Sequence, residues 1–420
     1  MASETTTNKV SQSRPPAKRG LPSVAEARAA MLAAVKPLEM QSVALDDVLG
    51  RVLAAPVFAS RDQPPFAVSA MDGYALRSED TPGVLRVTGE SAAGRGFTGS
   101  CEAGMAIRIS TGAAVPRGAD TIVIQEDVNR DGDRVTVPVA ARNQHIRPRG
   151  GDFAAGAMLL TAGSNLDGVA ISLAAASGAA MLSVVQRPRI AILSSGDELA
   201  EPGTAPGPWQ IFDSGTYGIC AMVRGWGGVA HRLAVERDDV EAIARAAEQG
   251  SRDSDLLVVI GGASVGDHDH ARPALMRLGL EVAVAKVAVR PGKPTWFGVT
   301  PRGPVLGLPG NPASALVCAR LFLRPLIEAM LGRDPQACTA FRRARLLHAL
   351  PANGPREHYL RARLDADDTG QLVVRAFEDQ DSSLISVFAA ANALIRLAPD
   401  APALTQGAMT DILPLGGVQC

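Results

Sequence analysis

The chain has 420 residues, which is too long for one hydrophobic core, so two to four domains are expected. Apolar residues make up 46% and charged residues 20%, the balance of an ordinary soluble globular protein. The net charge of −1 argues against a protein-wide attraction to nucleic acid or to anionic membranes, and the aromatic content of 4% argues against stacking platforms for single-stranded nucleic acid.

The five cysteines are scattered and form no C-x-x-C pair. Neither a disulfide framework nor a zinc knuckle is therefore expected, and the predicted localisation is the cytoplasm. The first twenty residues are polar and lack the apolar core of a signal peptide, so residues 1–20 are predicted to be a disordered tail.

The first half of the chain predicts a helix, a linking region and a small β domain. SVAEARAAMLAAVKP (23–37) begins with Ser23 and has Glu26 three residues later, a capping box before an amphipathic helix. Residues 44–60 predict a short helix, a glycine stop and a strand. Between 61 and about 156, short β-rich runs alternate with Gly and Pro, which predicts a mostly β domain.

The uncharged stretch 168–185 is rich in Ala and Ser and contains Gly178. It predicts a buried helix over about 168–177 that turns at Ser177–Gly178 into a strand over about 180–185, rather than a bilayer span.

From residue 188 onward, continuous apolar strands alternate with helices. Strands are expected in RIAILSS, VAHRLAVE, LLVVIGG, VAVAKVAV and PVLGLPG, and helices in DSGTYGICAMVRGWG, DDVEAIARAAEQG, ARPALMRLG and ASALVCARLFLRPLIEAML. This alternation predicts βαβ units around a buried parallel sheet. After about 340, LVVRAF, NALIRLA and TDILPL predict a terminal β domain.

Ligands of such sheets bind at the carboxyl ends of the strands. The segments expected there are SSGDEL (194–199), ERDD (236–239), GGASVGDHDH (261–270), RPGKP (290–294) and LPGNPAS (308–314). Their glycines, acids, prolines and one lysine point to a polar, phosphate-bearing ligand together with a divalent cation.

The loop 261–270 is compatible with several kinds of site. Gly262, Ser264 and Gly266 match the G-x-S-x-G pattern of a hydrolase elbow, but Gly266 and Pro273 delay the helix that an elbow requires. Asp269 lies at the expected sheet edge and suits Mg²⁺, whereas a solvated turn accounts equally well for Asp267 and His268.

Other candidates also have alternative roles. Glu198 precedes Pro202 and Gly203, so it does not start a helix and a functional role is favoured. Of Asp238 and Asp239, which precede a helix, the second is expected to be its cap.

Two further segments differ in how strongly they indicate a site. Lys293 lies between Pro291 and Pro294, which stiffen the loop and suit an oxyanion site. Asp72 precedes a glycine and, by itself, indicates only a turn.

Taken together, these segments resemble one family, the molybdopterin molybdenumtransferases, which include MoeA and the gephyrin E domain. The matching motifs, in order, are SAMDGYAL (69–76), TGAAVPRGADTIVIQED (111–127), IRPRGGD (146–152), SSGDEL, GGASVGDHD, RPGKP and GLPGNPAS. The resemblance covers essentially everything after residue 20.

The resemblance implies an α/β and β multidomain protein that forms a homodimer. It comprises a Rossmann-like, doubly wound molybdopterin-binding domain, a linking helix and strand domain, a small β-rich domain that contributes to the partner's site, and a C-terminal β-barrel-like domain. The molybdopterin-binding domain comprises residues 21–40 and 188–338, and the linking domain comprises residues 41–60 and 157–187. The small β-rich domain comprises residues 61–156, and the C-terminal domain comprises residues 339–420.

The resemblance also implies a reaction. Adenylylated molybdopterin and molybdate are the substrates, and Mg²⁺-dependent release of AMP accompanies metal insertion. A molybdopterin adenylyltransferase is the implied upstream partner. The implied catalytic residues are Asp72, Glu198, Asp238, Asp269 and Lys293, with Asp269 and Glu198 also as metal ligands. The implied substrate-binding residues are Thr111, Arg147, Asp152, Ser195, Gly262, Ser264, Gly266, Arg290, Pro309 and Pro312.

Four positions depart from the family pattern, namely Gly151, Gly215, His270 and Arg290. Arginine at 290 preserves the charge of the lysine that is frequent there but changes the donor geometry. The alternative is therefore a catalytically weakened paralogue that acts as a molybdopterin-binding or scaffold protein.

Overall fold

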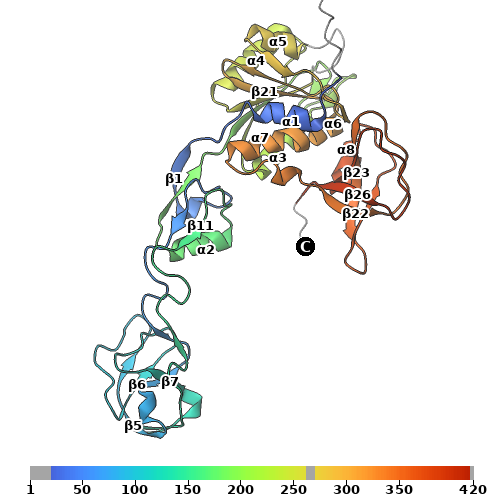
Figure 1. Cartoon of the computed structure of the whole chain (residues 1–420). Helices are drawn as coiled ribbons and strands as arrows, with labels where there is room; N and C mark the ends of the chain where they lie inside the picture. Colours follow the sequence, from blue (N-terminus) through green and yellow to red (C-terminus); the bar gives the residue numbers. More distant parts are fainter. Residues whose placement is uncertain (1–19, 262–269, 417–420) are drawn as a thin grey trace, which may run out of the picture. The chain divides into compact units, whose positions relative to one another are not determined.

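The computed structural model describes residues 20–261 and 270–416 (Figure 1). The chain divides into two compact units. The larger unit comprises residues 1–39 and 186–420, and the smaller unit comprises residues 40–185. Apart from residue 20, the predicted tail lies outside the described residues.

A six-stranded sheet organises the larger unit. Its order is β16 (Val229–Arg232), β13 (Arg189–Ser194), β17 (Leu256–Ile260), β21 (Gly303–Leu308), β20 (Trp296–Thr300) and β18 (Glu281–Val284). The first four strands are parallel, as the apolar runs predict. The strand order reverses at β13, because β16 and β17 lie on opposite sides of it, and such a point is where doubly wound sheets bind ligands.

Helices cover both faces of this sheet (Figure 1). One face carries α4 (Val240–Arg252) and α5 (Ala271–Arg277), and the other carries α1 (Val24–Leu32), α3 (Gly215–Gly225), α6 (Pro312–Cys318) and α7 (Arg324–Met330). A π-helical turn, η4 (Ala319–Leu323), joins α6 to α7. At the start of α1, Ser23 and Glu26 form the predicted capping box.

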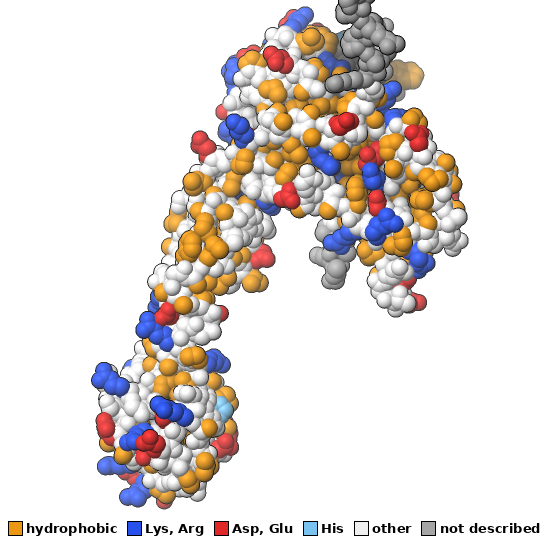
Figure 2. Space-filling model, in the orientation of Figure 1, with side chains coloured by type: hydrophobic (Ala, Val, Ile, Leu, Met, Phe, Trp, Pro, Cys, Tyr) orange, Lys and Arg blue, Asp and Glu red, His pale blue; other side chains and the backbone are white. Residues whose placement is uncertain are grey.

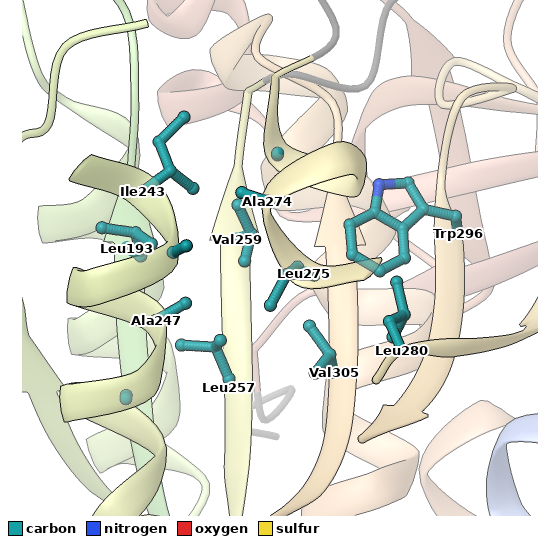
Figure 3. Close-up of a cluster of buried hydrophobic side chains, with 13 residues drawn as sticks. Leu193, Ile243, Ala247, Leu257, Val259, Ala274, Leu275, Leu280, Trp296 and Val305 are labelled. Atoms are coloured by element: carbon teal, nitrogen blue, oxygen red, sulfur yellow. The ribbon is translucent and has the colours of Figure 1, made fainter. Parts of the chain in front are cut away.

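The side chains between the sheet and the α4–α5 layer form a continuous apolar core (Figure 3). Leu193, Leu257 and Val259 point from the strands toward Ile243 and Ala247 of α4. The two strands thus each contribute alternate residues to this face, as the period of two in a strand requires. This packing holds β13 and β17 side by side, so their carboxyl ends lie together.

The sheet differs from the sequence prediction in two ways. The run 282–289 is not one strand, because β18 ends at Val284 and β19 (Val289–Arg290) joins a different sheet. Strand β20 was not predicted, and it runs antiparallel to both β21 and β18. Only a tight turn separates β20 from β21, and so short a connection permits an antiparallel pair but no parallel crossover.

The C-terminal part of the larger unit is a closed β-barrel. Strands β22 (Arg342–Leu346), β23 (Glu357–Ala366), β24 (Leu372–Ala376), β25 (Ala393–Leu397) and β26 (Met409–Pro414) pair in the order β23–β24–β22–β26–β25, and β25 pairs back to β23. The turn η5 (Ala337–Thr339) precedes the barrel, and α8 (Ile385–Ala390) lies between β24 and β25. Strand β19 extends the barrel as a parallel neighbour of β23.

The smaller unit contains a six-stranded sheet. Its order is β7 (Thr121–Ile124), β4 (Gly73–Leu76), β6 (Met105–Ile109), β5 (Gly83–Ser91), β9 (Arg134–Val137) and β8 (Asn129–Asp131). Apolar clusters around Tyr74 and around Ile109 pack against it. Short 3-10 turns occur at η2 (Ser78–Asp80) and η3 (Gln125–Asp127).

The rest of the smaller unit consists of short strand pairs and one helix. The pairs are β1 (Met40–Ala44) with β12 (Met181–Val185), β2 (Val57–Phe58) with β11 (Met158–Leu160), and β3 (Val68–Ser69) with β10 (Ile146–Arg147). A 3-10 turn, η1 (Leu45–Asp47), follows β1. Helix α2 (Gly168–Ala176) turns at Ser177–Gly178 toward β12, as predicted.

These elements confirm the predicted fold class, while the exact boundaries of the four predicted domains stay predictions. Among the described helices, none is both long and apolar enough to span a membrane. On the face seen in Figure 2, Lys and Arg side chains are interspersed with Asp and Glu.

Candidate functional site

A cavity of about 890 Å³ lies at the carboxyl ends of β13 and β17. Its lining comprises Ser194, Ser195, Asp197, Glu198, Leu199, Trp209, Ile211, Phe212, Asp213, Ser214, Gly215, Asp238, Ile260, Gly261, Pro294, Pro309, Gly310, Asn311, Pro312 and Ser383. It therefore lies at the edge where the strand order reverses, as predicted for the ligand site.

Five of the predicted site residues line this one cavity. They are Ser195, Glu198, Asp238, Pro309 and Pro312, which come from three separate stretches of the chain. Glu198 is followed by the short strand β14 (Leu199–Ala200) rather than by a helix, so its carboxylate does not cap one. The sheet topology thus brings these residues together, whereas their sequence positions are more than 110 residues apart at the extremes.

The loop after β13 holds Ser195 and Glu198 at the cavity. The Ser195 hydroxyl is buried, and among the described residues it has no hydrogen-bond partner. A polar group buried without a partner is costly, so this hydroxyl is ready to bond a ligand. The Glu198 carboxylate lies against Gly196, where an added Cβ would be only 2.6 Å from Glu198 Oε2.

Asp213 is a cavity residue that the sequence analysis did not single out. It is only 3% exposed, and it accepts hydrogen bonds from the Thr216 N–H at 3.2 Å, from the Thr216 hydroxyl and from the Ser194 hydroxyl at 3.4 Å. Arg232 lies 3.7 Å from its carboxylate. Asp213 therefore holds the start of α3 against the end of β13, and its position at the first residue of a predicted helix was the available signal.

The described part of the cavity lining is negatively charged. Asp197, Glu198, Asp213 and Asp238 all contribute carboxylates, and no Lys or Arg is present among the described residues that line the cavity. Arg232 compensates Asp213 from outside the lining and also pairs with Glu201 at 2.8 Å, a contact that lowers the pKa of Glu201. The carboxylates of Glu198 and Asp238 make a donor set that suits a hard divalent cation.

Two carboxylates, those of Glu198 and Asp238, suit a Mg²⁺ ion that is bound by the protein and by a substrate together. In residues 20–261 and 270–416, no three or more His, Cys, Asp or Glu side chains are grouped so as to hold a metal by themselves. Mg²⁺ commonly uses one or two carboxylates and completes its octahedron with water and substrate phosphate. Among the described lining residues, Glu198 and Asp238 could supply those carboxylates, and Asp197 lies in the same lining.

The predicted cations Arg290 and Lys293 do not line the cavity, although Pro294 does. Both side chains are exposed, and Arg290 belongs to β19 of the barrel sheet. Residues 290–294 reach the edge because they precede the antiparallel strand β20, not because they follow a parallel strand as the sequence suggested. Gly262, Ser264, Gly266 and Asp269 lie outside the described residues.

In the smaller unit, Asp72 and Thr111 form a pair. The Thr111 N–H and hydroxyl donate to Asp72 Oδ1 at 2.6 Å and 3.0 Å. These two bonds, the backbone one first, hold the pKa of Asp72 below its ordinary value. Both side chains are exposed, so the pair presents an ionised carboxylate at the surface.

Arg147 and Asp152 line a second cavity, of about 850 Å³, that lies within the smaller unit. Arg61, which was not predicted, also lines it, together with Gly112 and the departure residue Gly151. Two guanidinium groups and one carboxylate make this lining suitable for an anionic ligand. The predicted residues of this unit thus fall into two groups, the Asp72–Thr111 pair and this cavity.

Three family models match consecutive parts of the chain. Residues 22–178 match the MoeA N-terminal region (domains I and II), residues 191–329 match a probable molybdopterin binding domain, and residues 343–415 match the MoeA C-terminal region (domain IV). The matches include the segments that form both cavities.

Curated relatives match the chain over most of its length. The chain is 34% identical over 400 residues to molybdopterin molybdenumtransferase 2 of Mycobacterium tuberculosis, covering 92% of this chain and 97% of that protein. It is 35% identical over 322 residues to molybdopterin molybdenumtransferase of Nostoc, covering 74% of each. A crystal structure of the molybdopterin biosynthesis MoeA protein from Pyrococcus horikoshii is similar with a TM-score of 0.83 and 28% identity, covering 95% of this chain and 100% of that one.

Proposed function

The chain belongs to the molybdopterin molybdenumtransferases, transferases of molybdenum cofactor biosynthesis, and from this premise we propose the reaction that it catalyses. In this proposal it binds adenylylated molybdopterin and molybdate, inserts molybdenum into the dithiolene, and releases AMP in a Mg²⁺-dependent step. The observation that carries the proposal is the cavity at the switch point of the sheet, which joins the carboxylates of Glu198 and Asp238 to the unpartnered hydroxyl of Ser195.

Each of these residues has a role that follows from its chemistry. Cleavage of a phosphoanhydride requires neutralisation of the charge on its oxygens, which Mg²⁺ supplies when it is bound. Glu198 and Asp238 would hold that ion at the cavity, and the Ser195 hydroxyl would donate a hydrogen bond to an anionic oxygen of the substrate. Water would attack the phosphorus as the phosphoanhydride breaks, so the reaction needs no protein nucleophile, and Ser264 would act as a hydrogen-bond donor. Asp269 and Lys293 complete the proposed set as metal ligand and anion-binding cation.

We further propose that the chain acts as a homodimer in the cytoplasm, downstream of a molybdopterin adenylyltransferase. Asp72, Thr111, Arg147 and Asp152 would then be supplied to the reaction by a second copy of the chain. Mixed dimers test this point, because Asp72→Ala and Glu198→Gln place their defects in different units. Mixed dimers should recover part of the activity that each variant lacks, and complete inactivity of the mixture would show that the arrangement is wrong.

The reaction itself is tested by measuring AMP release from adenylylated molybdopterin. Release by the full chain should require both molybdate and Mg²⁺, and EDTA should abolish it. Glu198→Gln removes a carboxylate from the cavity and should lower the rate strongly. Glu201→Gln is the matched control, because Glu201 lies just beyond β14 and pairs with Arg232 instead of lining the cavity. AMP release without molybdate, or equal rates for both variants, would contradict the proposal.

The alternative is a paralogue that binds the same ligands without turnover. One observation favours it, since two of the four departures line the cavities, Gly215 in the first and Gly151 in the second. An added Cβ at Gly215 would make only ordinary contacts, 3.6 Å or longer, so the fold does not impose glycine there. A folded wild-type chain that binds AMP but releases none from the adenylylated substrate would support this alternative.

A further inference from the structure

Trp209 is the most exposed large apolar side chain of the described chain, with 89% of its surface accessible. It nevertheless lines the cavity that holds Ser195, Glu198 and Asp238. An indole exposed to this degree remains in contact with water unless a ligand or a partner covers it. Its position at the cavity makes a ligand of that cavity the candidate occupant.

The backbone holds Trp209 in a fixed place. Residues 207–210 form a turn in which the Gln210 N–H donates to the Gly207 carbonyl at 3.1 Å, and Pro208 restricts the position before the tryptophan. The Gln210 side chain locks the turn further, because its amide oxygen accepts from the Gly207 N–H at 2.9 Å.

Gln210 also ties this turn to the loop that carries Glu198. Its amide nitrogen donates to the carbonyl oxygens of Asp197 at 3.2 Å and Leu199 at 3.4 Å. The Ile211 N–H donates to the Glu198 carbonyl at 2.7 Å. The backbone that carries Trp209 and the Glu198 segment are therefore held relative to each other before any ligand binds, so binding has only the Trp209 side chain left to order there.

The residues after Trp209 extend the apolar part of the lining. Ile211 and Phe212 are 59% and 47% exposed, and both line the same cavity. The cavity thus combines an apolar stretch over residues 209–212 with the carboxylates and hydroxyl described above. This combination suits a molecule with a flat ring system at one place and a phosphate, bound through a cation, at another.

We propose that Trp209 is a positioning residue that stacks on a fused two-ring heteroaromatic group of the ligand. The inference rests on the proposed function, whose substrate carries two such groups, a purine and a pterin. Stacking on an aromatic side chain tolerates different bases, because every such ring has a π face. Phenylalanine should therefore replace Trp209 with little loss, whereas alanine should not.

The test compares ligands with and without a ring. Equilibrium dialysis measures the Kd of AMP, of biopterin and of ribose 5-phosphate for the wild type, Trp209→Ala and Trp209→Phe. The alanine variant should raise the Kd of a ring-bearing ligand by about 5- to 100-fold, and the phenylalanine variant should stay within about 3-fold of wild type. The Kd of ribose 5-phosphate, which has the phosphate of AMP but no base, should not change. An effect on AMP identifies the purine, and an effect on biopterin identifies the pterin.

A second measurement uses fluorescence. The chain has three tryptophans, and Trp296 is fully buried while Trp226 is half-buried, so acrylamide quenching reports mainly on Trp209. If the purine of AMP stacks on Trp209, AMP should reduce the acrylamide quenching of wild-type fluorescence. It should not change the quenching of Trp209→Phe, which lacks this indole.

Two results would overturn the inference: unchanged Kd values for both ring-bearing ligands, whether or not the oligomeric state of Trp209→Ala changes, or an equal change for ribose 5-phosphate. Because Trp209 is exposed, the variants should melt like wild type, which thermal denaturation checks. Failure of wild-type AMP release together with the expected dialysis pattern would refute the proposed reaction and leave the stacking intact.

Discussion

Gly307→Ala should destabilise the larger unit, although glycine-to-alanine changes in a strand normally stabilise it. Gly307 lies in β21 directly opposite Trp296 of β20. An added Cβ would lie 1.9 Å from Trp296 Cε2 and 2.0 Å from its Nε1, far inside contact distance. The indole is fully buried and belongs to the core beneath α4 and α5 (Figure 3), so any shift of the ring displaces packed neighbours.

The change in the free energy of unfolding caused by Gly307→Ala is the difference between two opposing effects. An alanine in a strand interior gains about 0.5–1 kcal/mol over glycine. Forcing an extra methyl group into a packed core costs about 1–3 kcal/mol, and the overlap with Trp296 places this site at the upper end of that range. We therefore expect a net loss of about 2–2.5 kcal/mol of unfolding free energy, which lowers the Tm of a unit of this size by about 4–10 °C.

Differential scanning calorimetry on the full chain measures this change. Gly225→Ala is the matched control, because Gly225 lies in α3 and an added Cβ there meets nothing within 4 Å. That variant should keep or slightly raise the Tm, since alanine favours helix. A Gly307→Ala chain that melts at or above the wild-type temperature would refute the argued packing of Trp296.

Three other predictions separate structural from functional roles. Asp239 caps α4 by accepting from the Ala242 N–H at 2.7 Å, so Asp239→Ala should cost about 1 kcal/mol of stability. Asp238, one position earlier, lines the cavity, so Asp238→Asn should lower the rate of AMP release without a change in Tm. A lowered Tm for Asp238→Asn and a lowered rate for Asp239→Ala would show that Asp238 is the cap and Asp239 the site residue. Thr111→Val removes one of the two bonds to Asp72, so the pKa of Asp72 should rise part of the way to its ordinary value, as carboxyl NMR would show. Burial, assisted by Arg290, lowers the pKa of His358 from 6.5 to about 4. Between pH 6.5 and pH 4 the unfolded chain therefore protonates His358 while the folded chain does not. The contribution of the neutral His358 to the free energy of unfolding is complete above pH 6.5 and is lost as the pH falls toward 4. His358→Phe should therefore lose less Tm between pH 7 and pH 5 than wild type, and an equal loss would contradict this.

Patterns of short range predicted much of the fold. The capping box of Ser23 and Glu26, the cap at Asp239 and the turn at Ser177–Gly178 depend on residues within one or two turns of each other, and all three are present. The continuous apolar strands 189–194 and 256–260 likewise indicated a sheet buried on both faces. From that sheet, the general rule that ligands bind at the carboxyl ends of strands predicted Glu198, Asp238 and the 309–312 segment at one edge.

Tertiary structure alone decided which of those edge residues line the cavity. Trp209 and Asp213 line it because pairing of Leu199 with Ile211 folds residues 207–213 back over the end of β13, and no local pattern encodes that pairing. Strand β20 runs opposite to its neighbours because a tight turn connects it to β21, and this direction places Pro294 in the lining but leaves Lys293 outside it. Local sequence thus determined which elements form, since capping and periodicity act over a few residues. The composition of the cavity was decided by contacts between segments far apart in the chain, whose geometry exists only once the sheet has assembled.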